Sequence, residues 1–112
     1  MTVDDPALIL ISTTLPHQQS AIELAHKLVS ERLVACAQVL PPMTSVYAWQ
    51  GQLCQDSEHL LLLKTTADNF PQVAAYLQQN HPYTEPQITG IPISYASQGY
   101  KQWVIESTRP QP

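Results

Sequence analysis

The longest regular pattern along the chain covers residues 45–66 and predicts a β-hairpin. Its first part carries Tyr47 and Trp49, aromatic residues of the kind that fill a pleated strand. Gln50-Gly51 is expected to form the turn, because glycine readily adopts the positive φ that other residues avoid. The returning strand is expected to cover residues 53–66.

The returning strand contains four consecutive leucines, which make both of its faces apolar. Side chains alternate between the faces of a strand, so Leu60 and Leu62 point one way while Leu61 and Leu63 point the other. One face can be covered by helices of the same chain. A chain of 112 residues has little left to cover the second face, so we infer that this face meets another copy of the protein.

Two further strands and a helix are predicted ahead of the hairpin. The nearly continuous apolar run over residues 7–13 fits a central strand. Pro16 is expected in the first turn of a helix, whose apolar stripe is Ala21, Leu24, Ala25, Leu28 and Val29. Residues 34–40 have the composition of a strand, and Pro41-Pro42 separates them from the hairpin. This predicts either one long kinked strand or two short strands in line.

Beyond the hairpin, the pattern predicts a second helix and a fourth strand. Asp68 is expected to cap the helix, with Pro71 in its first turn, and the proline of Asn80-His81-Pro82 should end it. The buried stripe of this helix is Phe70, Val73, Ala74 and Leu77. Residues 87–94 fit a strand that Pro92 marks as an edge or bulged one.

A short helix over residues 99–106 is expected to present Tyr100, Trp103 and Val104, and residues 108–112 are expected to be disordered because they have nothing to bury. The order strand, helix, strand, strand, helix, strand predicts an α+β fold. This fold is a ferredoxin-like βαββαβ subunit with an antiparallel sheet and both long helices on one face. Residues 1–112 are interpreted as a single domain with an ordered core over about 7–106.

Charge and cysteine usage exclude several classes of protein. The net charge of -4 argues against binding a nucleic-acid backbone, and a charged content of only 12% leaves a neutral surface that suits subunit contacts. No stretch approaches the roughly 18 to 20 apolar residues of a membrane span, and Asp4 and Asp5 stand where a secretory signal would be basic. The protein is therefore predicted to be cytoplasmic. Cys36 and Cys54, which lack CxxC spacing, are predicted to be free thiols.

Several short segments occur in a recognisable order: Thr13-Thr14-Leu15-Pro16; Arg32-Leu33-Val34-Ala35-Cys36-Ala37; Ser45 and Tyr47 with Trp49 and Gly51; Lys64-Thr65-Thr66; His81-Pro82-Tyr83 with Pro86; and Tyr100 with Trp103. Together they resemble the CutA divalent-cation tolerance family over about residues 7–105. The resemblance implies a ferredoxin-like subunit in a compact homotrimer, similar to the PII signalling proteins, whose clefts between subunits bind small ligands. It also implies a non-catalytic role in tolerance or homeostasis of divalent metals, copper above all.

Three positions depart from metal-binding members of the family that the sequence resembles. Such members can carry a cysteine where this chain has Ser12 and a second histidine where it has Asn80, and Gln87 replaces the acidic residue that is usual in the family after Pro86. Each change removes a candidate metal ligand or a negative charge.

His81 and Cys36 are the candidate metal ligands, because imidazole suits copper and zinc and a thiolate suits Cu(I). Three copies of His81 from a trimer would form a site if they converged on the symmetry axis. The alternative for His81 is a histidine that caps a helix, and the alternative for Cys36 is a small residue packed in a strand. His17, His26 and His59 have no partner at metal-ligand spacing and are expected at the surface.

A small-molecule pocket between subunits is the second hypothesis for binding. Aromatic walls with a few charged groups are typical of such sites, and the candidates are Tyr47, Trp49, Glu58, Lys64, Tyr83, Glu85 and Trp103. Lys64 lies inside an apolar strand, where an unpaired ammonium is costly. Its expected partner is Glu58, Glu85 or a ligand anion. The alternative to a ligand pocket is that Lys64 forms an internal salt bridge and the aromatic residues pack at the subunit interface.

Catalysis is the least supported of the three functional hypotheses. The chain contains only three glycines and no phosphate loop, GxSxG or HExxH motif. A Glu58–Lys64 or His81–Glu85 pair could exchange protons, but nothing in the sequence fixes a substrate. We therefore expect no enzyme activity, no bound nucleic acid and no membrane association.

Overall fold

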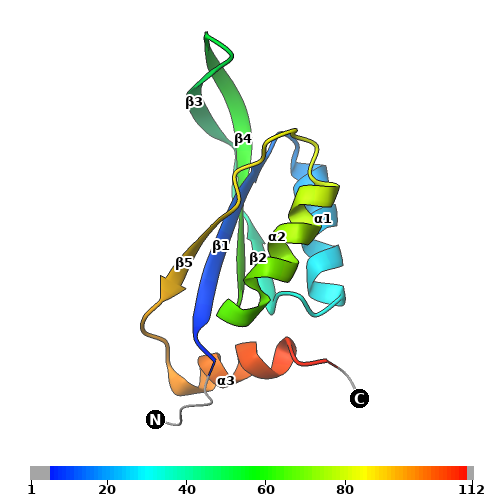
Figure 1. The fold of residues 1–112 in the computed structure, drawn as a ribbon, viewed down its shortest axis with the longest axis vertical. Coiled ribbons are helices and arrows are strands. Elements are labelled where there is room, and N and C mark those ends of the chain that lie inside the picture. The colour runs from blue at the N-terminus through cyan, green and yellow to red at the C-terminus, as the bar shows by residue number, and fades with distance from the viewer. Residues whose placement is uncertain (1–5, 111–112) are drawn as a thin grey trace.

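The computed structural model describes residues 6–110, which form five strands and three α-helices (Figure 1). In chain order the elements are β1 (Leu8–Leu15), α1 (Gln18–Ser30), β2 (Cys36–Val39), β3 (Met43–Trp49), β4 (Gln52–Thr66), α2 (Phe70–Asn80), β5 (Thr89–Ile93) and α3 (Gln98–Ser107). A single 3-10 turn, Ala67–Asn69, precedes α2.

The strands pair antiparallel in the spatial order β2-β4-β1-β5, and β3 pairs with the remaining length of β4. Cys36 to Val39 lie opposite Lys64 to Leu61, whereas Met43 to Trp49 lie opposite Glu58 to Gln52. The Pro41-Pro42 pair therefore separates two short strands in line along one long partner. Counted as one interrupted strand, β2 and β3 complete the ferredoxin-like βαββαβ order, which confirms the predicted fold class.

Helices α1 and α2 cover one face of the sheet (Figure 1). Leu61 and Leu63 of β4 are fully buried beneath them, as the alternation of strand side chains predicts. The rest of this core comes from β1, both helices and the α1–β2 connection: Ile11, Leu15, Ala21, Leu24, Leu28, Val34, Val73 and Leu77. Burying a valine, leucine or isoleucine side chain contributes roughly 1.5 to 3 kcal/mol, so this cluster is a main source of stability for the single chain.

The second face of the sheet carries Leu10, Ser12 and Thr14 of β1, which lie opposite Lys64, Leu62 and Leu60. Helix α3 covers one end of this face, where Val104 and Ile105 form a small core with Leu8 and Ala35. Both long helices lie on the other face, so the middle of the second face has no helix over it. There Leu60 and Leu62 remain half-buried, and Ile91 on the neighbouring strand is 59% exposed.

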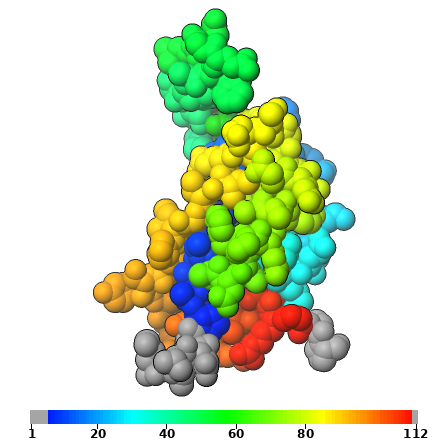
Figure 2. All heavy atoms as spheres, in the orientation of Figure 1, coloured from blue at the N-terminus to red at the C-terminus, as the bar shows by residue number. Residues whose placement is uncertain are grey.

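Strands β3 and β4 extend beyond the body as a two-stranded arm, which stands clear of the other elements in the space-filling view (Figure 2). The turn at its tip has Gln50 at φ 50° and Gly51 at φ 78°, the paired positive values of a two-residue hairpin turn. Because β4 spans 15 residues, the arm gives the protein a long dimension of 50 Å against 27 and 23 Å.

Three local predictions are wrong in detail. Asn69, not Asp68, is the N-cap residue of α2, because residues 67–69 form a 3-10 turn and delay the start of the helix. Val29 is 39% exposed at the end of the α1 stripe. His59 is buried, with Nδ1 3.2 Å from the carbonyl oxygen of Leu40, because its odd position on β4 faces the helices.

Two groups contact the C-terminal residues 108–110, which belong to the tail that the sequence predicts to be disordered. The Thr108 hydroxyl donates to the carbonyl oxygen of Val104 at 3.0 Å. Arg32, held at φ 61° after α1, donates to the carbonyl oxygens of Glu106 and Arg109 at 2.8 and 2.6 Å. Positive charge at the C-terminal end of α3 also suits the helix dipole. The last two residues of the predicted disordered tail, 111–112, lie outside the described residues.

Candidate functional site

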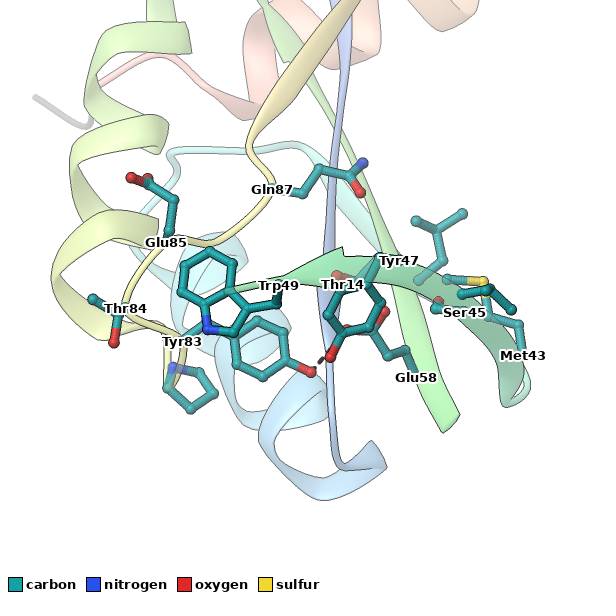
Figure 3. Close-up of a pocket in the computed structure, with 13 residues that line it drawn as sticks. Thr14, Met43, Ser45, Tyr47, Trp49, Glu58, Tyr83, Thr84, Glu85 and Gln87 are labelled. Carbon is teal, nitrogen blue, oxygen red and sulfur yellow. Dashed lines mark hydrogen bonds between the residues drawn. The ribbon is translucent and has the colours of Figure 1, made fainter. Parts of the chain in front are cut away.

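A cavity of about 640 Å³ lies where the β3–β4 arm leaves the body, and residues 82–87 form its opposite wall (Figure 3). We call it the arm-base pocket. It is lined by Thr14, Met43, Ser45, Val46, Tyr47, Trp49, Glu58, Leu60, Pro82, Tyr83, Thr84, Glu85 and Gln87. Its volume falls in the range of roughly 300 to 1,000 Å³ that small-molecule sites occupy.

Strand alternation explains why these residues meet. Thr14 and Leu60 are register partners on the second face of the sheet. Glu58 precedes Leu60 by two residues on β4, so its side chain lies on the same face. Tyr47 and Trp49 are likewise two residues apart on β3 and share one side of the arm. The proline after His81 ends α2 and turns the chain so that residues 82–87 pass beside these strands.

Two tyrosine–carboxylate pairs lie at the arm-base pocket. The Tyr83 hydroxyl donates to Glu58 Oε2 at 2.7 Å, and the Tyr47 hydroxyl donates to Asp56 Oδ2. The hydrogen bond to Asp56 is the main reason that the pKa of Tyr47 rises to about 12. Burial, reinforced by the bond to Glu58, raises the pKa of Tyr83 still further above its usual value. Both phenols therefore stay protonated and act as donors to carboxylates at neutral pH.

His81 bonds to two residues that line the arm-base pocket and uses both ring nitrogens to do so. Nε2 donates to the carbonyl oxygen of Thr14 at 2.8 Å, and Nδ1 accepts from the backbone N–H of Tyr83 at 3.1 Å. Burial lowers the pKa of His81, against the opposing effects of the Thr14 bond and of Glu58. The imidazole is therefore neutral with its proton on Nε2, and its single lone pair is already occupied. In this arrangement neither ring nitrogen of His81 is free to ligate a metal ion, which is the role predicted for it.

A second cluster lies at the other end of the sheet, under α3. Cys36 and Lys64 are register partners on β2 and β4. Tyr100 lies with its hydroxyl 3.4 Å from Cys36 Sγ and its ring centroid 6.0 Å from Lys64 Nζ. The ring of Trp103 is 5.7 Å from that of Tyr100. Burial first, and then the bond to Cys36, raise the pKa of Tyr100 to about 12.

A comparison with protein families gives a match to the description "CutA1 divalent ion tolerance protein" over residues 9–107. This match spans most of the chain. The chain belongs to the CutA1 divalent ion tolerance family. The family is described by ion tolerance and not by a reaction.

CutA proteins from several organisms are similar to this chain over most of its length. The divalent-cation tolerance protein CutA of Thermus thermophilus is 40% identical over 99 residues, which are 88% of this chain and 96% of that protein. The crystal structure of CutA1 from Oryza sativa is 31% identical, covers 96% of this chain and 98% of its own, and superposes with a TM-score of 0.91. The periplasmic divalent cation tolerance protein CutA from Archaeoglobus fulgidus is 27% identical, with a TM-score of 0.88 and coverage of 91% and 99%.

The three positions at which the sequence predicts a departure from metal-binding members, Ser12, Asn80 and Gln87, do not all meet in the structure. Ser12 Oγ lies 2.9 Å from Thr89 Oγ1 and accepts a hydrogen bond from Gln87 Nε2 at 3.3 Å, so a neutral polar trio occupies the second face there. Asn80 lies apart, where its side chain donates to the Tyr76 carbonyl oxygen. Within residues 6–110, no group of three or more His, Cys, Asp or Glu side chains is placed to hold a metal ion.

Five of the seven predicted pocket residues of this CutA chain line the arm-base pocket: Tyr47, Trp49, Glu58, Tyr83 and Glu85. Lys64 and Trp103 belong to the cluster under α3 instead. Lys64 shares a strand face with Glu58, as expected. The two residues are six positions apart on β4, however, and at roughly 3.3 Å per residue they are separated by about 20 Å along the strand. Glu58, one of the three alternatives predicted as the partner of Lys64, is therefore not its partner within one chain. Sequence reasoning missed Thr14, Leu60 and Met43, which only the strand register brings to the pocket.

Proposed function

We propose that this CutA chain acts in divalent-cation tolerance as a non-catalytic homotrimer, with copper the first cation to test. The observation that carries the proposal is the second face of the sheet. Its middle holds Leu10, Leu62 and Ile91, and both long helices lie on the opposite side. An exposed apolar surface of this kind marks a contact with another protein, and closed symmetry is the usual form of such contacts between identical chains.

Unpaired strand edges support the same proposal. Strand β5 pairs with β1 alone, and β3 pairs with β4 alone, so each leaves one edge without a partner in the described chain. An edge strand presents free backbone N–H and C=O groups, which natural proteins cover or pair. The resemblance to PII-like trimers implies that long strands of neighbouring subunits extend one another's sheets. The arm carries Val46 and Leu53 with exposures of 63 and 82%, which fits burial against another copy.

Size-exclusion chromatography with multi-angle light scattering tests the oligomer directly. A mass of three chains at micromolar concentration is expected, and a monomer would contradict the proposal. Calorimetric titration of the same sample with Cu(II) tests the metal role. Because residues 6–110 of one chain include no group of three or more side chains placed to hold a metal ion, we expect binding to come from groups that several copies contribute. Loss of copper binding on dissociation of the trimer is therefore the expected signature.

A second candidate function is regulation by a small ligand, as in PII-like proteins, and the arm-base pocket is the observation that favours it. The pocket combines three aromatic side chains with two carboxylates in a cavity of about 640 Å³, the composition expected of a small-molecule site. Its outer wall is the arm, so contact with a neighbouring subunit would close it further. We also propose a cytoplasmic location, which the free thiols Cys36 and Cys54 support. Residues 6–110 include no helix that is both long and apolar enough to cross a membrane.

A further inference from the structure

We propose that the arm-base pocket binds a small organic cation, of the class of quaternary ammonium compounds and protonated amines. This inference deepens the small-ligand function proposed above and rests on it. It names the charge and the chemical class of the ligand, and both follow from the groups that line the cavity. An anionic ligand such as a nucleotide is the main alternative.

The charged groups at the pocket are carboxylates. Glu58 and Glu85 line it, and the lining contains no lysine, arginine or histidine. Asp56 adds a third carboxylate through its bond with Tyr47. Lys64, the one basic residue predicted for this site, lies at the other end of β4 beside Tyr100. A phosphate group would therefore meet only negative charge here, whereas a cation would be attracted.

The two phenolic hydroxyls of the pocket are already engaged in hydrogen bonds. The hydroxyls of Tyr83 and Tyr47 both point to carboxylates, at Glu58 and Asp56. Glu58 is only 7% exposed, and Tyr83 is its one hydrogen-bond partner among the described residues. A carboxylate with so little access to water and no cationic partner is costly. A bound cation would supply the missing charge.

Aromatic faces provide the second half of the recognition. Figure 3 shows the rings of Tyr47, Trp49 and Tyr83 in the region between Glu58 and Glu85. Tyr47 and Trp49 are 42 and 49% exposed, and none of the three rings stacks on another in the described chain, where Tyr83 contacts His81 instead. Free faces of tryptophan and tyrosine attract cations, and cages of such rings are the usual way in which proteins recognise quaternary ammonium groups.

The same composition argues against a bare metal ion at this site. Only two carboxylates line the pocket, and no larger group of metal-binding side chains exists within residues 6–110. Hard divalent cations need about six oxygen ligands, and softer ones need nitrogen or sulfur. Aromatic rings provide neither. An organic cation uses both the carboxylates and the aromatic rings of the pocket.

The test compares choline with its neutral isostere 3,3-dimethyl-1-butanol, in which carbon replaces the charged nitrogen, and with ATP. Each is titrated calorimetrically into the purified, intact oligomer. We expect choline to bind at least about tenfold more tightly than the isostere, and ATP not to bind. Glu58→Gln keeps an oxygen acceptor for Tyr83 and should weaken choline at least about tenfold. Glu85→Gln, a substitution of an exposed residue, should weaken it in the same direction without affecting folding.

Trp49→Leu and Trp103→Leu form a matched pair of variants. Both remove a half-exposed tryptophan, at 49 and 46% exposure, but only Trp49 lines the pocket. Trp49→Leu should abolish choline binding, and Trp103→Leu should leave it unchanged. Equal loss in both variants would overturn the proposal.

Other results would overturn the proposal of a cation ligand without overturning the functions proposed above. Equal affinity for choline and its isostere, or tight binding of ATP, would show that the pocket does not select a cation, although a small-ligand function would survive. A trimer that binds none of the three compounds would overturn this inference alone. Choline binding by a monomer would uphold the inference and overturn the trimer, because one chain supplies every residue that lines the pocket.

Discussion

Thr13 and Thr65 are both fully buried threonines on neighbouring strands, but only Thr65 has a hydrogen-bond partner. The Thr65 hydroxyl donates to the carbonyl oxygen of Leu33 at 2.8 Å and accepts from Asn69 Nδ2 at 3.2 Å. The Thr13 hydroxyl has no partner within the described chain. A buried hydroxyl without a hydrogen bond destabilises the folded state, typically by about 1 to 3 kcal/mol.

Thr13→Val should therefore leave the free energy of unfolding unchanged or raise it by about 1 kcal/mol, because it replaces the unpaired hydroxyl with a methyl group of similar volume. Thr65→Val is the matched control and should lower the free energy of unfolding by about 1 to 3 kcal/mol. Urea denaturation of both variants measures the difference. Equal destabilisation would show that Thr13 has a partner after all.

The acid side of the stability profile depends on His81. Burial lowers its pKa below the ordinary value of 6.5, so the unfolded chain binds a proton more readily than the folded chain. The stability that neutral His81 contributes is present above pH 6.5 and is lost as the pH falls from there through the lowered pKa. The expected result is a melting temperature that decreases between pH 7 and pH 5.

His81→Gln separates this effect from other titrations. A glutamine amide can still donate to the Thr14 carbonyl oxygen but does not titrate. The variant should be less stable than the parent at pH 7, and its melting temperature should decrease less on acidification. Parallel pH profiles for the two proteins would show that another group is responsible.

At the scale of elements, the arm depends on its two-residue turn. Gln50 and Gly51 both have positive φ, a conformation that costs most residues about 1 to 2 kcal/mol. A Cβ atom at Gly51 would meet nothing within 4 Å, so any effect of a substitution there is conformational and not steric.

Gly51→Ala should lower the free energy of unfolding by about 1 kcal/mol, and Gln50→Asn should raise it by a few tenths of a kcal/mol, because asparagine tolerates positive φ better than glutamine. Thermal unfolding followed by circular dichroism measures both. Gly99→Ala is a suitable control, because Gly99 also meets nothing within 4 Å and lies in a helix with ordinary φ. A loss at Gly51 no larger than at Gly99 would argue against this account of the turn.

At the scale of the whole molecule, the single chain is more extended than its length requires. Its radius of gyration is 15.1 Å, against about 13 Å for a compact domain of this size. The difference comes from the arm, which buries little against its own body. Together with the uncovered middle of the second face, it describes a chain whose shape suits assembly with other copies.

Ile91→Glu should dissociate the proposed trimer without unfolding the chain, because Ile91 is 59% exposed in one subunit and lies in the middle of the second face. Val29→Glu is the matched control, since Val29 is 39% exposed on α1 and belongs to the helix-covered side. Light scattering should give a monomer for the first variant and a trimer for the second. An intact trimer carrying Ile91→Glu would place the contact elsewhere.

The sequence by itself determined the elements, their order and the membership of the family. Leu61 and Leu63 follow from strand periodicity, the Gln50-Gly51 turn from backbone preference, and the end of α2 from Pro82, and all of these are local effects. Local rules were less reliable where neighbouring structure intervened. Helix α2 starts later than predicted because residues 67–69 form a 3-10 turn. His59 is buried because it lies on the face of β4 that the helices cover.

The tertiary structure alone decided which side chains share a site. Glu58 and Lys64 have the same strand face, but their separation along β4 places one at the arm-base pocket and the other under α3. The commitment of both His81 nitrogens depends on Thr14, which is 67 residues away in the chain. Such contacts arise from strand register and from the path of residues 82–87. They are properties of pairing between distant segments, which no local pattern of residues encodes.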